Sequence, residues 1–286
     1  MTVVQLFETF LTHQEVRGKP KTVKFYRDCA RIWTDALGGR SAARLTLADV
    51  NAVVADRREA GRAPGTCNGY LRTLKAALRF GKRQGHLRAV PVEIQLLKVT
   101  RTKVRAFDRE EVGRLLASAG RRERMLLALL GATGMRVDEA LHLKWADFNP
   151  LEGAILISAK PEVGWSPKSH AEREVFLGEE IIQELETYRK GQVGAADSDW
   201  IFQTRTGARL KSTFRAVRKV FKDCGLYEHR KLHHQLRRSA ASSMLVAGTD
   251  LNTVREILGH ASITTTQLYL ASNRDAKRAA ARRSVV

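Results

Sequence analysis

A proline-led basic segment at residues 91–106 divides the sequence into two parts, and it constrains the fold of the chain more than any other feature. It reads PVEIQLLKVTRTKVRA, shows no clear hydrophobic period and carries four basic side chains. Such a segment is typical of a linker, and its charge predicts that it lies along phosphates. We therefore expect two domains, residues 1–90 and 107–286, in line with the rough size of 100–200 residues per domain.

The first ninety residues predict four helices, because their apolar residues recur with helical spacing. Thr2 is placed to cap the first, Pro20 opens the second and Thr46 precedes the third. The fourth, from about Thr66 to Gly85, gathers five basic side chains in a sector of roughly 100°: Arg72, Lys75, Arg79, Lys82 and Arg83. A charged stripe is usually a solvated face, but no acid interrupts this one, so contact with DNA is the favoured interpretation.

The second part opens at FDREEV, where Asp108 and Glu111 have capping-box spacing and Phe107 with Val112 matches a hydrophobic staple. Helical patterns follow in RRERMLLALLGATG and MRVDEALHLKWADF, and again at about 212–225, 234–247 and 251–258. GAILISAK and EREVFL are strand-like and are separated by a long hairpin turn, and WIFQ predicts a short strand. The expected fold is mainly α with a small β-sheet or hairpin: a four-helix domain followed by a mixed α+β domain.

The charge of the chain indicates a polyanionic partner. Fifty Lys and Arg against 30 Asp and Glu give a net charge of +20, and residues 1–105 alone hold 21 basic and eight acidic side chains. The basic residues are spread along the chain rather than gathered beside an amphipathic anchor, which favours nucleic acid over a membrane surface. Three distant cysteines without a CxxC spacing predict a reducing compartment, and no apolar run approaches the ~18 residues of a membrane span. We expect a cytoplasmic, nucleoid-associated protein with no membrane contact.

The stretch LGHASITTTQLYL, residues 258–270, places His260 nine residues before Tyr269. On one unbroken helix that spacing turns the chain by roughly 900° and puts the two side chains on opposite faces. Gly259 is a good helix stop and a threonine is a good N-cap, so two helices joined at a corner near Thr264 are predicted. The alternative is that Tyr269 packs in a core and His260 is an ordinary surface residue.

Several residues match what cutting a phosphodiester without a metal requires: fixed cations, a proton donor and a nucleophile. Arg136 stands at a predicted helix start, with Glu139 one turn later to orient it. His234 and Arg237 share a helix face, and Lys168 lies in the hairpin turn, where a long side chain could reach a site. Each also has an ordinary interpretation as a surface ion pair, a solvated histidine or a turn lysine.

These segments together resemble the tyrosine recombinases, the phage integrase family. GATGMRVDEALHLKW resembles their first arginine box, HHQLRRSAASSML their His-x-Leu-Arg box, and LGHASITTTQLYL their Leu-Gly-His box followed by the nucleophilic tyrosine. PKSHAEREVFL is similar to the hairpin that carries their catalytic lysine. The order and spacing match over roughly 105–275. The resemblance implies a clamp around duplex DNA, with a core-site-binding domain at 1–90, a basic linker at 91–106, and a catalytic domain with a C-terminal tail at 107–286.

Carried to this sequence, the resemblance implies that Arg136 and Arg237 clamp the scissile phosphate and that His260 hydrogen-bonds it. Tyr269 would attack to form a 3′-phosphotyrosyl link and release a 5′-hydroxyl. No metal, ATP or other cofactor is implied.

Of the two proton-transfer positions, the lysine is less well defined than the histidine. The resemblance implies that Lys168 protonates the departing 5′-oxygen and that His234 assists proton transfer at Tyr269. The hairpin is longer than usual and also contains Lys160, so Lys160 stays open as the alternative. Departures from the family pattern remove no catalytic group: Phe176, Gln235, Arg238 and Ser239.

The implied function is site-specific DNA recombination by a tetramer on duplex DNA core sites, with accessory DNA-bending proteins as further candidate partners. A type IB topoisomerase shares the chemistry and is the nearest alternative. A DNA-binding protein of the same fold without activity is another. A metal-dependent nuclease is disfavoured, since adjacent histidines point different ways on a helix and no acidic cluster accompanies them: His233, His234 and His260.

Overall fold

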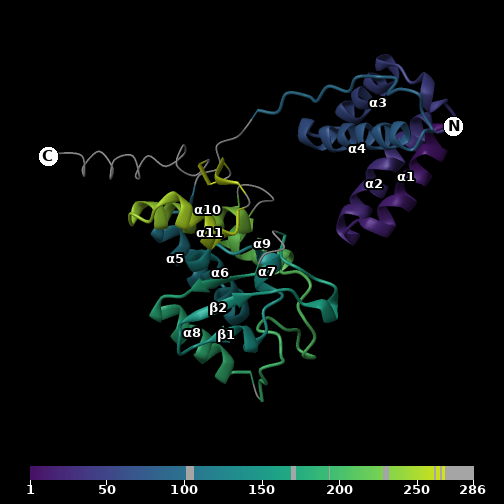
Figure 1. Ribbon diagram of the computed structural model, residues 1–286. Coiled ribbons are helices and arrows are strands. Elements are labelled where there is room, and N and C mark those ends of the chain that lie inside the picture. The colour runs from purple at the N-terminus through teal and green to yellow at the C-terminus, as the bar shows by residue number, and fades with distance from the viewer. Residues whose placement is uncertain are drawn as a thin grey trace. The chain divides into compact units, whose positions relative to one another are not determined.

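The computed structural model describes residues 1–100, 106–168, 172–192, 194–227, 232–260, 262–264, 266 and 267. The chain divides into two compact units, Met1–Thr102 and Lys103–Val286. Both are built mainly from helices, and the second also contains a small sheet of three strands (Figure 1). This confirms the predicted fold class, mainly α with a small sheet in the second unit.

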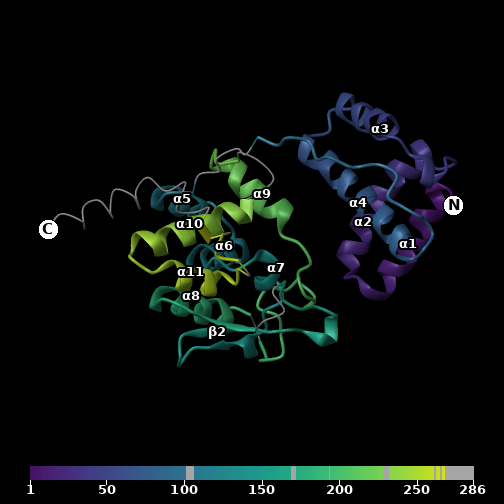
Figure 2. The same ribbon diagram turned by 45° about the horizontal axis from the view of Figure 1, so that its top comes forward.

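The N-terminal unit contains the four predicted helices: α1 (Val3–Arg17), α2 (Pro20–Leu37), α3 (Leu47–Glu59) and α4 (Pro64–Arg83). The Thr2 hydroxyl accepts from the backbone N–H of Gln5, and the Gln5 side chain returns a bond to the backbone of Thr2. Thr46 and Asp49 make the same capping box before α3. Helix α4 begins two residues before the expected Thr66, because Pro64 takes the first helical position. Figure 2 shows α1, α2 and α4 packed together.

The first part of the segment expected to be a linker is instead packed on α4. Val92 and Ile94 are buried in the core of the N-terminal unit. The Asn68 side chain bonds both the carbonyl and the N–H of Leu97, at 2.9 and 2.8 Å. Lys75 Nζ donates to the Ile94 carbonyl at 3.3 Å. The apolar side chains and backbone groups of residues 92–97 are therefore bound to α4, and contact of this segment with phosphates stays a prediction. Residues 101–105 lie outside the described part of the chain.

The C-terminal unit is organised around α6 (Arg121–Thr133), which packs against α5 (Arg109–Ala117), α8 (Glu179–Lys190) and α10 (Leu232–Val246). The remaining helices are α7 (Val137–Ala140), α9 (Phe214–Asp223) and α11 (Leu251–Leu258). The predicted capping box of Asp108 and Glu111 is present. The helices expected near 212–225, 234–247 and 251–258 are confirmed, whereas α8 was not predicted.

The sheet consists of β1 (Phe148–Asn149), β2 (Ala154–Ile157) and β3 (Arg173–Phe176) in the order β1-β2-β3, with both pairs antiparallel. The predicted hairpin is therefore correct. The predicted strand WIFQ is wrong, because Trp200 and Gln203 form only isolated bridges. Ile201 and Phe202 are both fully buried, so that segment is a core-filling connection rather than a strand with one wet face.

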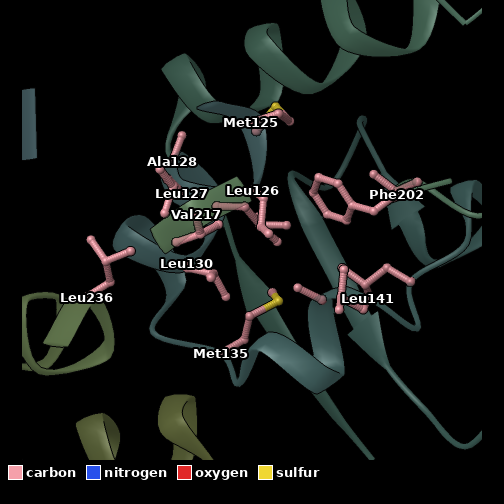
Figure 3. Close-up of a cluster of buried hydrophobic side chains, with 14 of the residues drawn as sticks. Met125, Leu126, Leu127, Ala128, Leu130, Met135, Leu141, Phe202, Val217 and Leu236 are labelled. Atoms are coloured by element: carbon pink, nitrogen blue, oxygen red, sulfur yellow. The ribbon is translucent and has the colours of Figure 1, made fainter. Parts of the chain in front are cut away.

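Helix α6 is apolar almost all round, and this fixes the position of the loop that follows it. Leu126, Leu127, Leu129 and Leu130 are completely buried. Figure 3 shows α6 side chains in contact range of the surrounding core, with Phe202 on one side and Val217 and Leu236 on the other. A helix anchored this firmly places its C-terminal end, Thr133 and Gly134, in a defined position.

Candidate active site

The first candidate arginine stands at the junction of α6 and α7. Gly134 ends α6 in the left-handed conformation, with φ of 65°. A Cβ at this position would lie 2.5 Å from the Leu258 Cδ2 atom, so glycine is required both by the backbone angle and by the close approach of α11. Arg136 follows as the N-cap of α7. Its backbone N–H donates to Glu139 at 2.8 Å and its Nη1 donates to the other carboxylate oxygen at 2.9 Å, so Glu139 orients Arg136 as predicted.

The second candidate arginine, Arg237 of α10, is buried and joins two helix ends. Its side chain donates to the Gly134 carbonyl at 2.7 Å and to the Leu258 carbonyl at 2.6 Å. Only 3% of the residue is exposed. Both bonds go to neutral carbonyl oxygens, which hold the guanidinium in place without neutralising its charge.

A third arginine, Arg173 at the start of β3, lies beside Arg136 and Glu139, although no role was predicted for it. It donates to both oxygens of Glu139, at 2.7 and 3.3 Å, and its Nε donates to the Ile257 carbonyl at 3.1 Å. The sequence contained one signal that could have identified Arg173, the alternation of side chains along a strand. Val175 faces the core, so Arg173, two residues earlier, lies on the same side of the sheet. That inward arginine required a buried partner.

The three arginines bond three successive carbonyls at the end of α11. Arg173 bonds Ile257, Arg237 bonds Leu258, and Arg136 bonds Gly259 at 3.1 Å. The last carbonyls of a helix have no partner within the helix and carry its partial negative charge, so cationic donors stabilise them. Among these side chains only Glu139 is acidic, which leaves three positive charges against one negative. We name this group the arginine cluster: Arg136, Glu139, Arg173 and Arg237.

The Glu139 carboxylate holds the cluster together electrostatically. Burial by itself raises the pKa of this carboxyl, but hydrogen bonds and charges from Arg173 and Arg136 outweigh burial, and the pKa lies below its ordinary value. Glu139 is therefore ionised at neutral pH, with 1% of its side chain exposed. An ionised carboxylate between two guanidinium groups fixes both of them in orientation.

His260 lies at a corner directly after α11, as predicted. Gly259 ends the helix with φ of 65°, and a Cβ there would lie 2.9 Å from the Arg173 guanidinium. Helical backbone resumes at residues 263–264 and 266–267, and the Ser262 hydroxyl accepts from the Thr264 N–H at 3.3 Å. Ser262 therefore takes the capping position that was predicted for a threonine near 264. Tyr269 lies outside the described residues.

The His260 ring is held neutral by its surroundings. Burial lowers its pKa to about 4, and the charges of Arg237, Arg136 and Arg173 act in the same direction. The ring Nδ1 lies 2.9 Å from the Thr266 hydroxyl. When that hydroxyl donates to Nδ1, the neutral ring carries its proton on Nε2, where it can be donated to an anion. His260 is thus suited to bind a phosphate oxygen rather than to act as a further cation.

The two lysines of the hairpin have different environments. Lys160 is buried, with its Nζ 2.8 Å from the Asp147 carboxylate and 2.7 Å from the Ser158 hydroxyl. Lys168 is exposed. Because Lys160 is already paired in the core, its contacts favour Lys168 as the candidate proton donor.

The adjacent histidines of α10 also differ. His234 is exposed on α10, one turn before the buried Arg237. The His233 ring is partly buried beside Thr213, and burial with the neighbouring charge of His234 lowers its pKa to about 4. Among the residues that the structure describes, no three His, Cys, Asp or Glu side chains gather as metal ligands would. The same described part contains no helix long and apolar enough to cross a membrane.

The arrangement is a compact group of cationic side chains with a neutral hydrogen-bond donor beside it. The profile of the phage integrase family matches residues 105–275 of this chain. Tyrosine recombinase XerC of Oceanobacillus iheyensis is 29% identical over 299 residues, covering 96% of this chain and 94% of the relative. XerC of Lactobacillus delbrueckii subsp. bulgaricus is 30% identical over 287 residues, covering 94% of each chain.

Solved structures share the fold over nearly the whole chain. The integrase of transposon Tn1549, bound to transposon right end DNA, superposes with a TM-score of 0.80 at 24% identity and covers 100% of both chains. A lambda integrase dimer bound to a COC′ core site gives a TM-score of 0.72 at 17% identity, covering 94% of this chain and 77% of that one.

Proposed function

This chain belongs to the phage integrase family, and we propose that it breaks and rejoins duplex DNA at a specific site through Tyr269. It is a tyrosine-type, site-specific DNA recombinase, as the match to that family and to the XerC recombinases indicates. The arginine cluster carries the assignment of the site. Three buried or partly buried arginines around one carboxylate, all bonded to the end of the helix that leads to His260, fit a phosphodiester and its developing negative charge.

The proposed reaction starts with neutralisation of the scissile phosphate by Arg136 and Arg237. A phenol ordinarily has a pKa of about 10, and the phenolate formed from it is repelled by the negatively charged phosphate. Nearby guanidinium groups lower the cost of forming the phenolate and of bringing it to the phosphorus. His234, exposed one turn from Arg237, accepts the phenolic proton. His260 donates a hydrogen bond to a non-bridging oxygen.

The bond that forms joins the Tyr269 oxygen to phosphorus, and the bond that breaks joins phosphorus to the 5′-oxygen. Lys168 gives its proton to that departing oxygen, so that a neutral 5′-hydroxyl leaves. Attack by a 5′-hydroxyl on the phosphotyrosyl bond reverses the steps and restores Tyr269. The energy of the broken bond is kept in the phosphotyrosine, so the proposed reaction consumes no ATP and uses no metal.

We assign DNA binding outside the cleaved site to the N-terminal unit. Four members of the α4 stripe are exposed, whereas Lys75 is engaged by the Ile94 carbonyl: Arg72, Arg79, Lys82 and Arg83. We further propose that the enzyme works in the cytoplasm as a tetramer that exchanges strands sequentially, with residues after Tyr269 joining neighbouring protomers and DNA-bending proteins as accessory partners. The tail lies outside the described residues.

Mapping the covalent intermediate in cells tests this proposal against a type IB topoisomerase. DNA covalently attached to the protein is recovered after rapid denaturation, and the 3′ ends linked to it are sequenced. A recombinase yields one or a few positions, and the purified protein leaves supercoiled plasmid without that site largely unrelaxed. Attachment spread over many sequences, with efficient relaxation of any plasmid, would instead identify a topoisomerase.

A further inference from the structure

The part of the chain that carries Lys168 is held at two points by neighbouring carboxylates of α7. Before Lys168, the Trp165 indole Nε1 donates to Asp138 at 3.0 Å. After it, Arg173 donates to Glu139 at 2.7 Å. Asp138 and Glu139 are consecutive residues, and Glu139 also binds Arg136. The hairpin is therefore fastened on both sides of Lys168 to the same short helix that presents the first arginine.

The Trp165 side chain has a well-defined seat. Its indole stacks on the buried imidazole of His142, with ring centroids 4.2 Å apart and planes 7° from parallel. The His142 Nδ1 atom lies 2.6 Å from the Asp138 carbonyl oxygen, so the stacking partner is itself attached to α7. Stacking together with a hydrogen bond to a carboxylate fixes both the plane and the direction of the indole.

The backbone of Trp165 is fixed as well. Its carbonyl accepts from the Lys160 N–H at 2.8 Å, and its N–H donates to the Lys160 carbonyl at 3.1 Å. Lys160 is in turn anchored in the core by Asp147. The hairpin thus contains a closed turn at residues 160–165. Both the backbone and the side chain of its last residue, Trp165, are held in place three residues before Lys168.

We propose that Trp165 is a positioning residue for Lys168, the general acid of the proposed reaction on which this inference rests. Three residues of chain span at most about 11 Å, so a fixed Trp165 limits the volume that Lys168 can reach. The contacts of Trp165 with Asp138 and His142 give the flexible Lys168 side chain a rigid point of attachment. The sequence showed only that this hairpin is long and contains two lysines.

The expected consequence is a slower protonation of the leaving 5′-oxygen when the seat is removed. Trp165→Ala lets the hairpin sample other positions, so the Lys168 ammonium is found less often at that oxygen. General-acid catalysis by a positioned side chain raises a reaction rate by about 100-fold or more, and a displacement of about 1 Å can lower the rate by a similar factor. We therefore expect cleavage to slow by about 10- to 100-fold. Lys168→Ala sets the upper limit of the loss.

A change of leaving group separates this role from a merely structural one. Cleavage is measured in single turnover on the mapped target site, with either the natural 5′-bridging oxygen or a 5′-bridging sulfur at the scissile phosphate. A thiol has a pKa of about 8.5 and departs as a thiolate, so it needs no general acid. Trp165→Ala and Lys168→Ala should both be slow on the oxygen substrate and both return to nearly the wild-type rate on the sulfur substrate.

Trp200→Ala is the matched control, because Trp200 also touches His142, edge-on at 6.3 Å, but lies on another segment. It should not show rescue by sulfur. Trp165→Phe keeps the stacking and removes the bond to Asp138, and it supports the same comparison if Trp165→Ala does not fold. The positioning role is overturned if sulfur rescues Lys168→Ala but Trp165→Ala is equally slow on both substrates. It is also overturned if Trp165→Ala cleaves the oxygen substrate at the wild-type rate. Failure of sulfur to rescue Lys168→Ala refutes the general-acid assignment instead.

Discussion

Replacing Arg173 by glutamine tests how the arginine cluster is held together. The side chain is 11% exposed, its partner Glu139 is 1% exposed, and the substitution removes both bonds to Glu139 and the bond to the Ile257 carbonyl. Removing one member of a buried ion pair costs about 3–5 kcal/mol. Glu139 keeps two bonds from Arg136, so we expect a loss at the lower end, about 3 kcal/mol at pH 7.

The loss should depend on pH in a defined direction. Arg173 is a main reason that the pKa of Glu139 lies below its ordinary value of 4.5. A carboxyl whose pKa is lower in the folded state stabilises the fold above its unfolded pKa, and this contribution disappears as the pH falls through the folded pKa. The difference between wild type and Arg173→Gln should therefore be largest near neutral pH and should shrink below pH 4.5.

Urea denaturation at neutral and acidic pH measures this difference. Tryptophan fluorescence reports mainly on the C-terminal unit, which holds three of the four tryptophans: Trp145, Trp165 and Trp200. Replacing the exposed Arg215 by glutamine is the matched control and should change the free energy of unfolding by no more than about 0.5 kcal/mol. A loss for Arg173→Gln below about 1 kcal/mol, or one of equal size at both pH values, would refute the account of the cluster.

Three further outcomes follow from the same description. Replacing three exposed stripe residues, Arg72, Arg79 and Arg83, by glutamine should weaken DNA binding and reduce the salt slope by roughly 0.9 per lost phosphate contact, and an unchanged slope would leave the stripe a solvated face. Gly134→Ala should cost about 1–3 kcal/mol in a thermal or urea melt, since its Cβ would lie 2.5 Å from Leu258; a neutral effect would contradict the close approach. Deleting residues from Arg274 onward should spare half-site binding in a gel-shift assay but impair synapsis, and full recombination by the truncated protein would show the tail to be dispensable.

Local sequence signals were sufficient wherever a structural feature is decided within one helical turn. Thr2, Thr46 and Asp108 cap their helices as predicted, because each has its N3 partner three residues later. Gly134 and Gly259 end α6 and α11 as the sequence predicted, because glycine adopts the left-handed conformation without a steric cost. The corner that separates His260 from the following helical turn could therefore be predicted from the sequence.

Helix α8 and the WIFQ segment show where periodicity was misread. Helix α8 buries Leu185 and Tyr188, three residues apart, and has acids in its first turn and bases in its last, so its signal was present but not used. Ile201 and Phe202 are consecutive buried residues, and a short apolar run alone does not distinguish a strand from an irregular core segment.

The parts of the site that depend on distant contacts could not be predicted. Arg173 is separated by 34 residues from Glu139 and by 84 from Ile257, and the tertiary fold brings them together. The same holds for Lys160, whose choice of Asp147 as a partner leaves Lys168 as the candidate acid. The order of the motifs in the sequence identified the family pattern, whereas the hydrogen bonds among the residues of these motifs could be seen only in the folded structure.

The central claim is that Tyr269 is the nucleophile, and a nicked suicide substrate of the mapped site tests it most directly. Tyr269→Phe removes one oxygen and should leave folding and DNA affinity nearly unchanged. We expect it to abolish the protein–DNA band that survives detergent and disappears on protease treatment, while Tyr227→Phe keeps that band. If the Tyr269→Phe protein is still trapped covalently, the nucleophile is another residue and the proposed site is wrong.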